Sequence, residues 1–182
     1  MKGLKKKLSL VLASCMVFSL AGCKSKGGEE AKDPVQEDLI KYVETDLPTI
    51  KGNEATAIER YNEVSNGIAD MKRKEIASAF NDEIIPTYTT FVKDLEALSP
   101  ATEEVKALKD TYLSGAKDQL EGMIQLNEAI TSNDSDGAKA ANELITQGKT
   151  KIEQHRADIV TLANEHNINV SAGDVSASGE AS

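Results

Sequence analysis

Apolar residues recur at spacings of three and four along most of this chain, and that period predicts amphipathic helices. The last stripe consists of Ala138, Ala141, Ile145, Gly148, Ile152, His155, Ile159, Leu162 and His166. The stripe before it consists of Val105, Leu108, Tyr112, Ala116, Leu120, Met123, Asn127 and Ile130. Charged residues such as Lys149 and Asp158 fall off these stripes, so each predicted helix has one buried face and one solvent face.

Two earlier stripes are each interrupted by a proline. One consists of Ala77, Phe80, Ile84, Tyr88, Phe91, Leu95 and Leu98. The other consists of Leu39, Val43, Leu47 and Ile50, followed by Ala57, Tyr61, Val64 and Ile68. Proline lacks the N–H donor and its ring clashes with the preceding turn, so we expect kinks near Pro48 and Pro86. Two shorter helices are the alternative for the first segment.

Four such segments joined by short loops predict an all-α fold, an antiparallel up-down-up-down four-helix bundle over residues 34–166. We expect N-caps at Asp70, at Ser99 and at Asp134 or Ser135. Residues 167–182 are small, polar and aperiodic beyond their first few positions, which predicts a disordered tail.

The first 22 residues follow a different pattern. Four lysines and no acidic residue accompany an apolar run from Leu8 to Leu20 that is interrupted only by serines. A membrane-spanning helix needs roughly 20 apolar residues, and this run is shorter. Residues 1–22 are therefore predicted to be a signal peptide.

The end of that run, Leu20-Ala21-Gly22-Cys23, resembles the lipobox of bacterial lipoproteins. The resemblance implies cleavage between Gly22 and Cys23 and a diacylglyceryl group on the Cys23 thiol, with palmitate among the acyl chains. Two acyl chains hold a protein stably at a membrane, whereas one holds it marginally. A plain signal peptide with a chance cysteine is the alternative. Residues 23–33 would then form the lipidated cysteine and a flexible polar tether.

Charge argues against nucleic-acid binding. The chain has 21 basic and 30 acidic residues, and the predicted leader contains four of the basic ones, leaving 17 against 30 and a net charge of −13. Such a body lacks the basic patch that displaces counterions from phosphates. It is also repelled by an anionic membrane surface, so membrane attachment is predicted to depend on the lipid at Cys23.

Cysteine usage excludes several kinds of site from the predicted domain. The chain has two cysteines, Cys15 in the leader and Cys23 at the lipobox. The body therefore has no disulfide, thiolate metal site or cysteine nucleophile. We expect no cofactor.

The body is similar to small helical lipoproteins of low-GC Gram-positive bacteria. The resemblance lies in N-D-E-I-I-P-T-Y-T-T-F at residues 81–91 and L-S-P-A-T-E-E-V at residues 98–105. It implies a lipobox joined to an acidic helical body and no catalytic residue.

The two histidines are the residues most able to carry chemistry. His155 and His166 lie 11 residues apart, roughly 16 Å along a helix, so one metal ion cannot join them. A ligand, metal or haem site around His155, with Met123 or Met71 opposite, is one hypothesis. The alternative is a core histidine hydrogen-bonded to a tyrosine or carboxylate, with His166 fraying into solvent.

Asn127 is a second polar residue on a buried stripe. A buried asparagine often fixes helix register, and Asn127 is also placed to pair with His155. The tyrosines on or beside the stripes are predicted to pack with their hydroxyls at an edge or on an interior partner.

These observations predict a lipid-anchored, extracytoplasmic helical domain on the outer face of the cell membrane. We expect it to be a non-enzymatic module that binds a protein or another component of the cell envelope. The alternative is a carrier of a small ligand, metal or haem in the helical core around His155.

Overall fold

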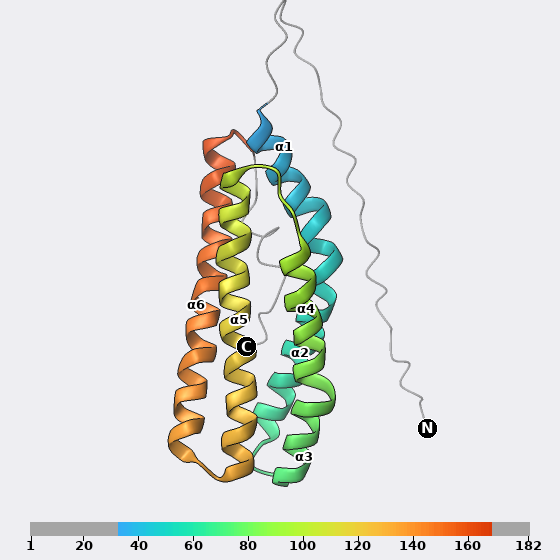
Figure 1. The fold of residues 1–182 in the computed structure, drawn as a ribbon, viewed down its shortest axis with the longest axis vertical. Helices are drawn as coiled ribbons and strands as arrows, with labels where there is room; N and C mark the ends of the chain where they lie inside the picture. Colours follow the sequence, from blue (N-terminus) through green and yellow to red (C-terminus); the bar gives the residue numbers. More distant parts are fainter. Residues whose placement is uncertain (1–32, 169–182) are drawn as a thin grey trace, which may run out of the picture. The chain divides into compact units, whose positions relative to one another are not determined.

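The computed structural model describes residues 33–168 of the chain. This part is all-helical and contains four helices with no strand among them (Figure 1). The predicted signal peptide at residues 1–22, the lipidated Cys23 with the tether up to residue 32, and residues 169–182 of the predicted tail lie outside the described residues.

The two proline-containing helices each include one π-helical segment. The first consists of α1 (Pro34–Lys41), the π segment η1 (Tyr42–Asp46) and α2 (Leu47–Gly67) in succession. The second consists of α3 (Arg73–Ser78), the π segment η2 (Ala79–Ile84) and α4 (Ile85–Ala97). The backbone stays in the right-handed helical region across these joins, so the alternative of two separate helices in the first segment is wrong.

Each π segment ends shortly before a proline. The amide of Leu47 donates to the carbonyl of Tyr42, and the amide of Ile85 donates to that of Phe80, so both bonds span five residues. The wider turn makes room for a proline ring, which would otherwise clash with the turn before it. The sequence therefore located the two distortions, and the structure shows their form.

The two remaining helices are α5 (Glu103–Ser132) and α6 (Ser135–Glu165). Asp134 caps α6, because its carboxylate accepts hydrogen bonds from the amides of Asp136 and Gly137. The other two expected caps are wrong, since Lys72 rather than Asp70 precedes α3 and Thr102 rather than Ser99 precedes α5.

The start of α5 is fixed by a residue from α1. Asp38 Oδ2 accepts hydrogen bonds from the amides of Ala101 and Thr102 at 2.9 and 2.8 Å and from Thr102 Oγ1 at 2.8 Å. Burial raises the pKa of Asp38, but these bonds together outweigh it, so the pKa lies below its usual value. This tertiary cap moves the helix start to Glu103, beyond the local signal at Ser99.

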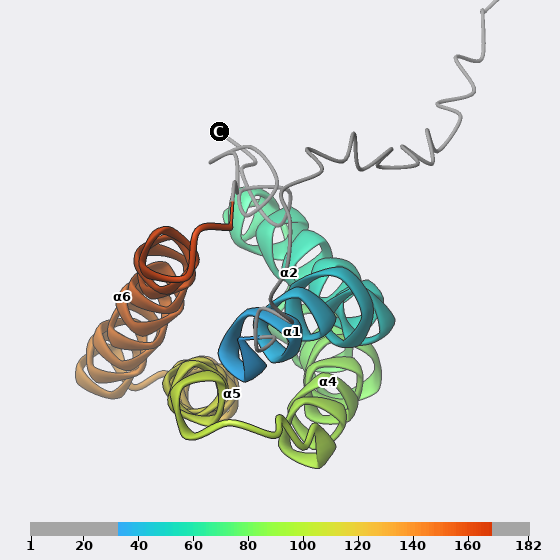
Figure 2. The same ribbon diagram turned by 90° about the horizontal axis from the view of Figure 1, so that it is seen from above.

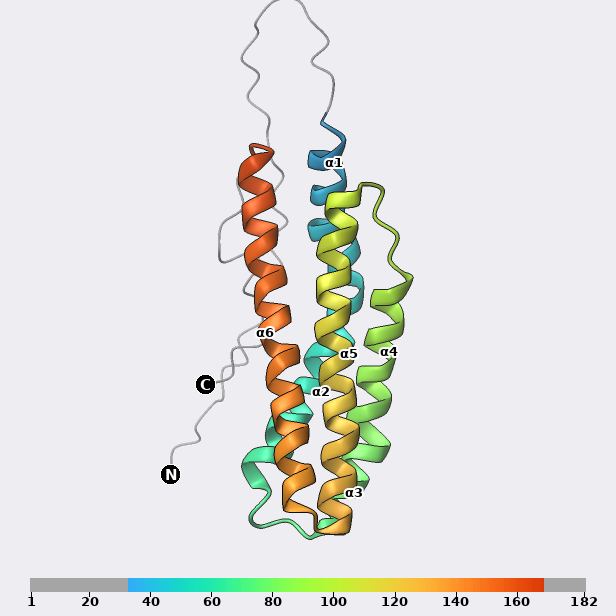
Figure 3. The same ribbon diagram turned by 60° about the vertical axis from the view of Figure 1, so that its left-hand side comes forward.

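The helices associate mainly in two pairs. α5 and α6 lie side by side along their length (Figure 3), while α2 packs against α4 (Figure 2). α4 also contacts α5, and α1 contacts both α5 and α6. The buried apolar core lies between these elements, with Tyr42, Tyr88, Phe91 and Leu95 among its most buried members.

Glycines allow α5 and α6 to approach at backbone distance. A Cβ atom on Gly148 would lie 2.5 Å from the carbonyl oxygen of Gly115, and one on Gly115 would lie 2.7 Å from that of Gly148. Farther along, a Cβ on Gly122 would lie 2.6 Å from Ile145. These contacts leave no room for a side chain at the three positions.

The first and last described helices are joined at one end. Asp33 Oδ1 caps α1 through the amides of Val35 and Gln36, while Asp33 Oδ2 lies 2.5 Å from His166 Nδ1. Gln36 Nε2 also donates to the His166 carbonyl at 3.1 Å. His166 is thus a half-buried partner of Asp33, and the expectation that it frays into solvent is wrong.

Among the helices of residues 33–168, none is both long enough and apolar enough to cross a membrane.

Candidate functional site: a polar cluster in the helical core

A cluster of polar side chains lies at the middle of the core, with members from three of the four helices. Tyr42 comes from η1, Glu54 from α2, Tyr112 from α5 and His155 from α6. Each occupies an inward position of its helix, and the exposed fractions of Glu54 and His155 are 6% and 3%. Charged or titratable groups are seldom buried to this degree unless they are paired.

His155 is held by two tyrosines. Its Nε2 shares a hydrogen bond with the Tyr42 hydroxyl at 3.1 Å. The ring stacks on Tyr112, with centroids 4.5 Å apart and planes 17° from parallel. The prediction of a core histidine hydrogen-bonded to a tyrosine is therefore confirmed.

The imidazole is neutral over the physiological pH range. Burial is the main cause, helped by the positive charges of Arg156 and Lys51, and it lowers the pKa of His155 from 6.5 to about 3. A charged imidazole in this position would lose the solvation that it has in water.

Glu54 is the second titratable member of the cluster. Tyr112 donates its hydroxyl proton to Glu54 Oε2 at 2.6 Å. Burial raises the pKa of Glu54, while the Tyr112 hydrogen bond and the charges of Arg156 and Lys51 offset part of the rise. Burial, with the nearby Glu54 charge, likewise raises the pKa of Tyr112. Tyr112 and Glu54 are thus joined by a short hydrogen bond in the buried core.

The aromatic contacts continue across the core to α4, which belongs to the one helix that contributes no member to the polar cluster. Tyr112 lies 5.6 Å from Phe91, and Phe91 lies 5.2 Å from Tyr88, measured between ring centroids. The Tyr88 hydroxyl donates to Gln119 Oε1 at 2.5 Å. As predicted for tyrosines on buried stripes, the hydroxyls reach interior partners.

Asn127 lies apart from His155. Its Nδ2 donates to Asn81 Oδ1 at 2.9 Å, so it joins α5 to η2, and the expected pairing with His155 is not formed. Asn127 is 7% exposed, and its Oδ1 has no hydrogen-bond partner. Asn127 therefore ties α5 to the π segment rather than adding to the His155 cluster.

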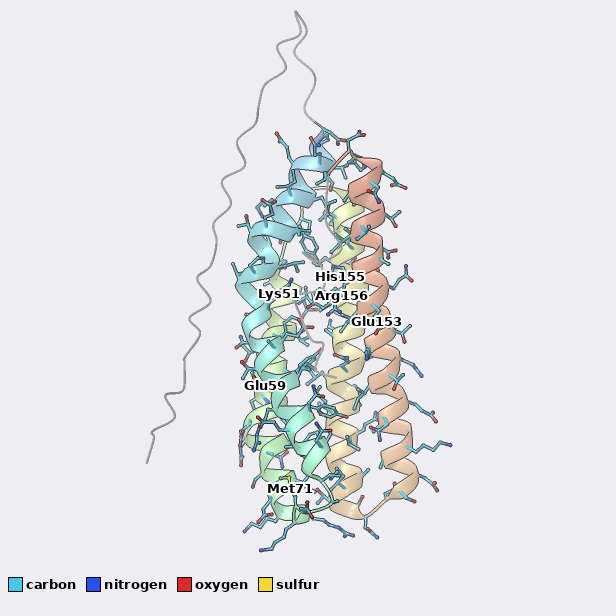
Figure 4. The ribbon with its side chains drawn as sticks, turned by 180° about the vertical axis from the view of Figure 1, so that it is seen from behind. Lys51, Glu59, Met71, Glu153, His155 and Arg156 are labelled. Carbon is cyan, nitrogen blue, oxygen red and sulfur yellow. The ribbon has the colours of Figure 1, made fainter. Side chains whose placement is uncertain are left out.

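Met123 is fully buried, but it lies away from His155 along the helix axis. It follows Tyr112, the residue stacked on His155, by 11 positions on α5, which corresponds to roughly 16 Å. Figure 4 shows Met71 close to the α3 end of the molecule, far from His155. Neither methionine is placed opposite the imidazole as the haem hypothesis requires.

Over residues 33–168, no group of three or more histidine, cysteine, aspartate or glutamate side chains is arranged to hold a metal ion. The His155 nitrogen that meets Tyr42 and the Glu54 oxygen that meets Tyr112 already take part in protein hydrogen bonds.

Glu54 is the member of the cluster that sequence reasoning missed. The first helix has apolar residues at positions 47, 50, 57, 61 and 64, and Glu54 occupies the position that completes this spacing of three and four. A glutamate in register with a buried stripe is the signal that points to it. Tyr112 and His155 were identified as stripe residues, although their partners were not. In the first helix the predicted stripe included Val43, whereas the structure buries its neighbour Tyr42 and leaves Val43 half-buried.

The N-terminal motif and the helical body together define the class of protein, a bacterial lipoprotein. The chain belongs to the family of EMYY-motif containing lipoproteins, whose model matches residues 4–176. The match includes Leu20-Ala21-Gly22-Cys23, so the predicted resemblance to lipoproteins is confirmed. The sequence has no consecutive Glu-Met-Tyr-Tyr. Comparisons with curated proteins and with solved structures give no match.

Family membership supports a protein of the cell envelope that is attached to a membrane by a lipid anchor. The geometry adds that the most polar part of the core is occupied by its own hydrogen bonds.

Proposed function

We propose that this lipoprotein is a non-enzymatic binding module, held by lipid on Cys23 at the outer face of the cell membrane of a Gram-positive bacterium. Its partner is a protein or another envelope component. The helices form an antiparallel up-down-up-down bundle that stands off the membrane on the tether of residues 23–33. The observation that carries this proposal is the family match, which spans the lipobox and the helical body together.

The state of the polar cluster supports a structural rather than a catalytic role for the core. Tyr42 engages His155, Tyr112 engages Glu54, and Tyr88 engages Gln119, all at hydrogen-bonding distance. Buried polar groups that are paired in this way help to specify one packing arrangement of the helices. Binding through the outer helical surfaces uses the rigid body that this network maintains.

Charge and attachment support the location. The acidic body has a net charge of −13 after the 17 basic and 30 acidic residues of positions 23–182 are counted. It is repelled by anionic headgroups, so two acyl chains on Cys23 are the means of attachment. The short loop between α5 and α6, at Asn133 and Asp134, suits antiparallel neighbours.

Crosslinking in intact cells tests the proposal. A C-terminally tagged chain would be crosslinked, extracted from membranes and analysed by mass spectrometry, with Cys23→Ala as the matched control that cannot be lipidated. We expect one reproducible crosslinked partner for the wild type and its loss, with release of the chain from the membrane, for Cys23→Ala. Absence of any enriched partner over several growth conditions would overturn the binding role.

The carrier hypothesis makes a different prediction for the same purified protein. A ligand bound to His155 Nε2 would have to replace the Tyr42 hydrogen bond. Metal analysis and an absorption spectrum of protein from its own host distinguish the two. A stoichiometric metal or a haem absorption band would favour the carrier, and their absence would favour the binding module.

A further inference from the structure

The two ends of the helical body lie at different distances from the predicted anchor. Asp38 on α1 contacts Thr102 at the start of α5, so α5 begins at the end of the body where Asp33 meets His166 (Figure 3). Asp33 follows Cys23 by ten positions, which extend over at most about 35 Å. The 30 residues of α5 extend about 45 Å from there to the opposite end. The opposite end is therefore the more remote from the anchor when the body stands on its tether.

This remote end consists of the turn between α2 and α3 and the loop between α5 and α6. Arg73 Nη2 donates to Asn133 Oδ1, which ties the turn to the loop. Met71, at the α3 end in Figure 4, packs half-buried against the core. Ile68 is 43% exposed, so an apolar side chain is open to solvent here. We call Ile68 and residues 71–74 the distal tip.

The distal tip contains three consecutive basic residues, Lys72, Arg73 and Lys74, and no other part of residues 33–168 has such a run. The side chain of Lys72 is 85% exposed, and its Nζ lies 4.0 Å from Glu75. The partner of Arg73 is the neutral amide of Asn133, which leaves the guanidinium charge in place. Lys74 is exposed and forms no ion pair within the described part of the chain. The charges of the run are therefore largely available to a partner.

The sign of this charge is opposite to that of the body. Residues 68–75 contain three basic residues against two acidic ones, Asp70 and Glu75, and have a net charge of +1. Residues 33–168 as a whole contain 14 basic and 26 acidic residues and have a net charge of −12. Electrostatic complementarity selects partners and orients them, so an acidic partner is attracted to the distal tip and repelled by most of the remaining surface.

The stability of α3 does not explain the basic run. Lys72 is the N-cap of α3, and Arg73 and Lys74 are its first two residues. Positive charges are unfavourable near the start of a helix, where serine, threonine, aspartate or asparagine is the preferred cap. Departures from local preference of this kind are expected where a function requires the residues.

We propose that the distal tip docks an acidic segment of a partner protein. Carboxylates of the segment meet the three cations, and an apolar side chain of the segment covers Ile68 and Met71. The apolar part of the tip favours a protein over an anionic polymer, which offers charge alone. Methionine suits such a contact because its flexible side chain adapts to different partners. This inference rests on the proposed binding function and adds to it the docking surface and the chemical class of the partner.

Photocrosslinking from single positions in intact cells tests the docking surface. In the full-length chain, a photoreactive phenylalanine analogue replaces Ala69, which is exposed in the turn of the distal tip, or Ala157, which is exposed on the side of α6. We expect position 69 to capture a protein through a peptide rich in aspartate and glutamate, and position 157 to capture none. Capture of a polymer or a lipid at position 69 would overturn the proposed occupant.

Charge reversal shows whether the capture depends on the basic run. Lys72→Glu combined with Lys74→Glu should abolish capture from position 69, and Ile68→Ser should weaken it. Lys93→Glu combined with Lys149→Glu is the matched control, since it makes the same charge change at exposed positions of α4 and α6 and should leave capture unchanged. Retained capture in the Lys72 and Lys74 double variant would overturn the proposal.

The two proposals fail in different ways. Capture from position 157 but not from position 69, or a chemically crosslinked partner with no capture at position 69, would overturn the distal tip and leave the binding function standing. Absence of any partner in both experiments would overturn the binding function as well.

Discussion

The α5–α6 pair and the proline-containing helices, residues 34–67 and 73–97, are held together by different means. α5 and α6 meet through backbone at Gly115 and Gly148, where no side chain fits. The earlier helices meet through long side chains, as in the edge-to-face contact of Tyr61 with Phe80 and the ion pair of Arg60 with Glu83.

The two kinds of helix contact are expected to respond differently to substitutions. Backbone contact fixes the distance between two helices tightly, so one added methyl group has to push them apart. Side-chain contact tolerates rearrangement, because rotamers adjust while the helices stay in place. The polar cluster joins the halves, since Tyr42 belongs to the first helix and His155 to the last.

Acidification is expected to cause the largest loss of stability, because it favours protonation of His155, which links the last helix to Tyr42 of the first. The pKa of His155 is lowered from 6.5 to about 3, so the native state resists a proton that the unfolded state accepts. Stability from the neutral imidazole is complete above pH 6.5 and is lost as pH falls toward 3. At about 1.4 kcal/mol per pH unit, the loss over this range approaches 5 kcal/mol.

Urea unfolding at several pH values measures this loss. The difference in unfolding free energy between the wild type and His155→Gln should shrink or reverse as pH falls through this range, because glutamine does not titrate. His166→Gln is the control, since it removes a half-buried histidine and leaves the buried one. Parallel pH profiles for the wild type and His155→Gln would contradict the assignment.

Adding one methyl group distinguishes the two halves directly. Gly148→Ala places a Cβ 2.5 Å from the Gly115 carbonyl, and we expect a loss of about 2–3 kcal/mol from the resulting strain. Gly52→Ala on α2 places its Cβ where nothing lies within 4 Å, and we expect a gain of about 0.5–1 kcal/mol from helix propensity. Chemical denaturation of both variants measures the two effects. Equal changes would show that the α5–α6 contact is not as close as described.

The tertiary cap between α1 and α5 predicts a smaller effect. Asp38→Asn keeps the size of the side chain but weakens acceptance from the amides of Ala101 and Thr102. We expect a loss of about 1–2 kcal/mol, as for other caps. Asp136→Asn in the first turn of α6 is the control, because it removes an exposed charge whose side chain caps nothing. Similar losses in both variants would mean that general charge, not the cap, is responsible.

The sequence predicted the helices well because their signal is local. Spacings of three and four identified the buried faces that include Tyr112 and His155, and the prolines located both distortions. The start of α5 was wrong because its cap, Asp38, lies 64 positions before Thr102. Local sequence contains no trace of such a partner.

The candidate site could be predicted only in part for a similar reason. Periodicity predicts that Tyr112 and His155 face inward, but not which helix each one meets or at which level, and in the first helix it selected Val43 instead of Tyr42. The 3.1 Å contact between Tyr42 and His155 depends on helix order and on the π segment that begins at Tyr42. Glu54 shows the reverse case, since its position in the stripe was available but its residue type concealed it.

Replacing Pro48 is expected to change stability the least, and it tests what causes the π segment in the first helix, residues 34–67. If the ring of Pro48 alone imposes η1, then Pro48→Ala should convert Tyr42–Asp46 into regular α-helix. That change would rotate α1 relative to α2 by about 100°, one residue of a helix. Asp38 would then leave the start of α5, and Tyr42 would leave His155.

Because these contacts hold the rotation in place, we expect the π segment to persist in Pro48→Ala, with stability changed by less than about 1 kcal/mol. Amide chemical shifts across Tyr42–Asp46, together with urea unfolding, measure this outcome, and a regular helix there would assign the distortion to the proline alone.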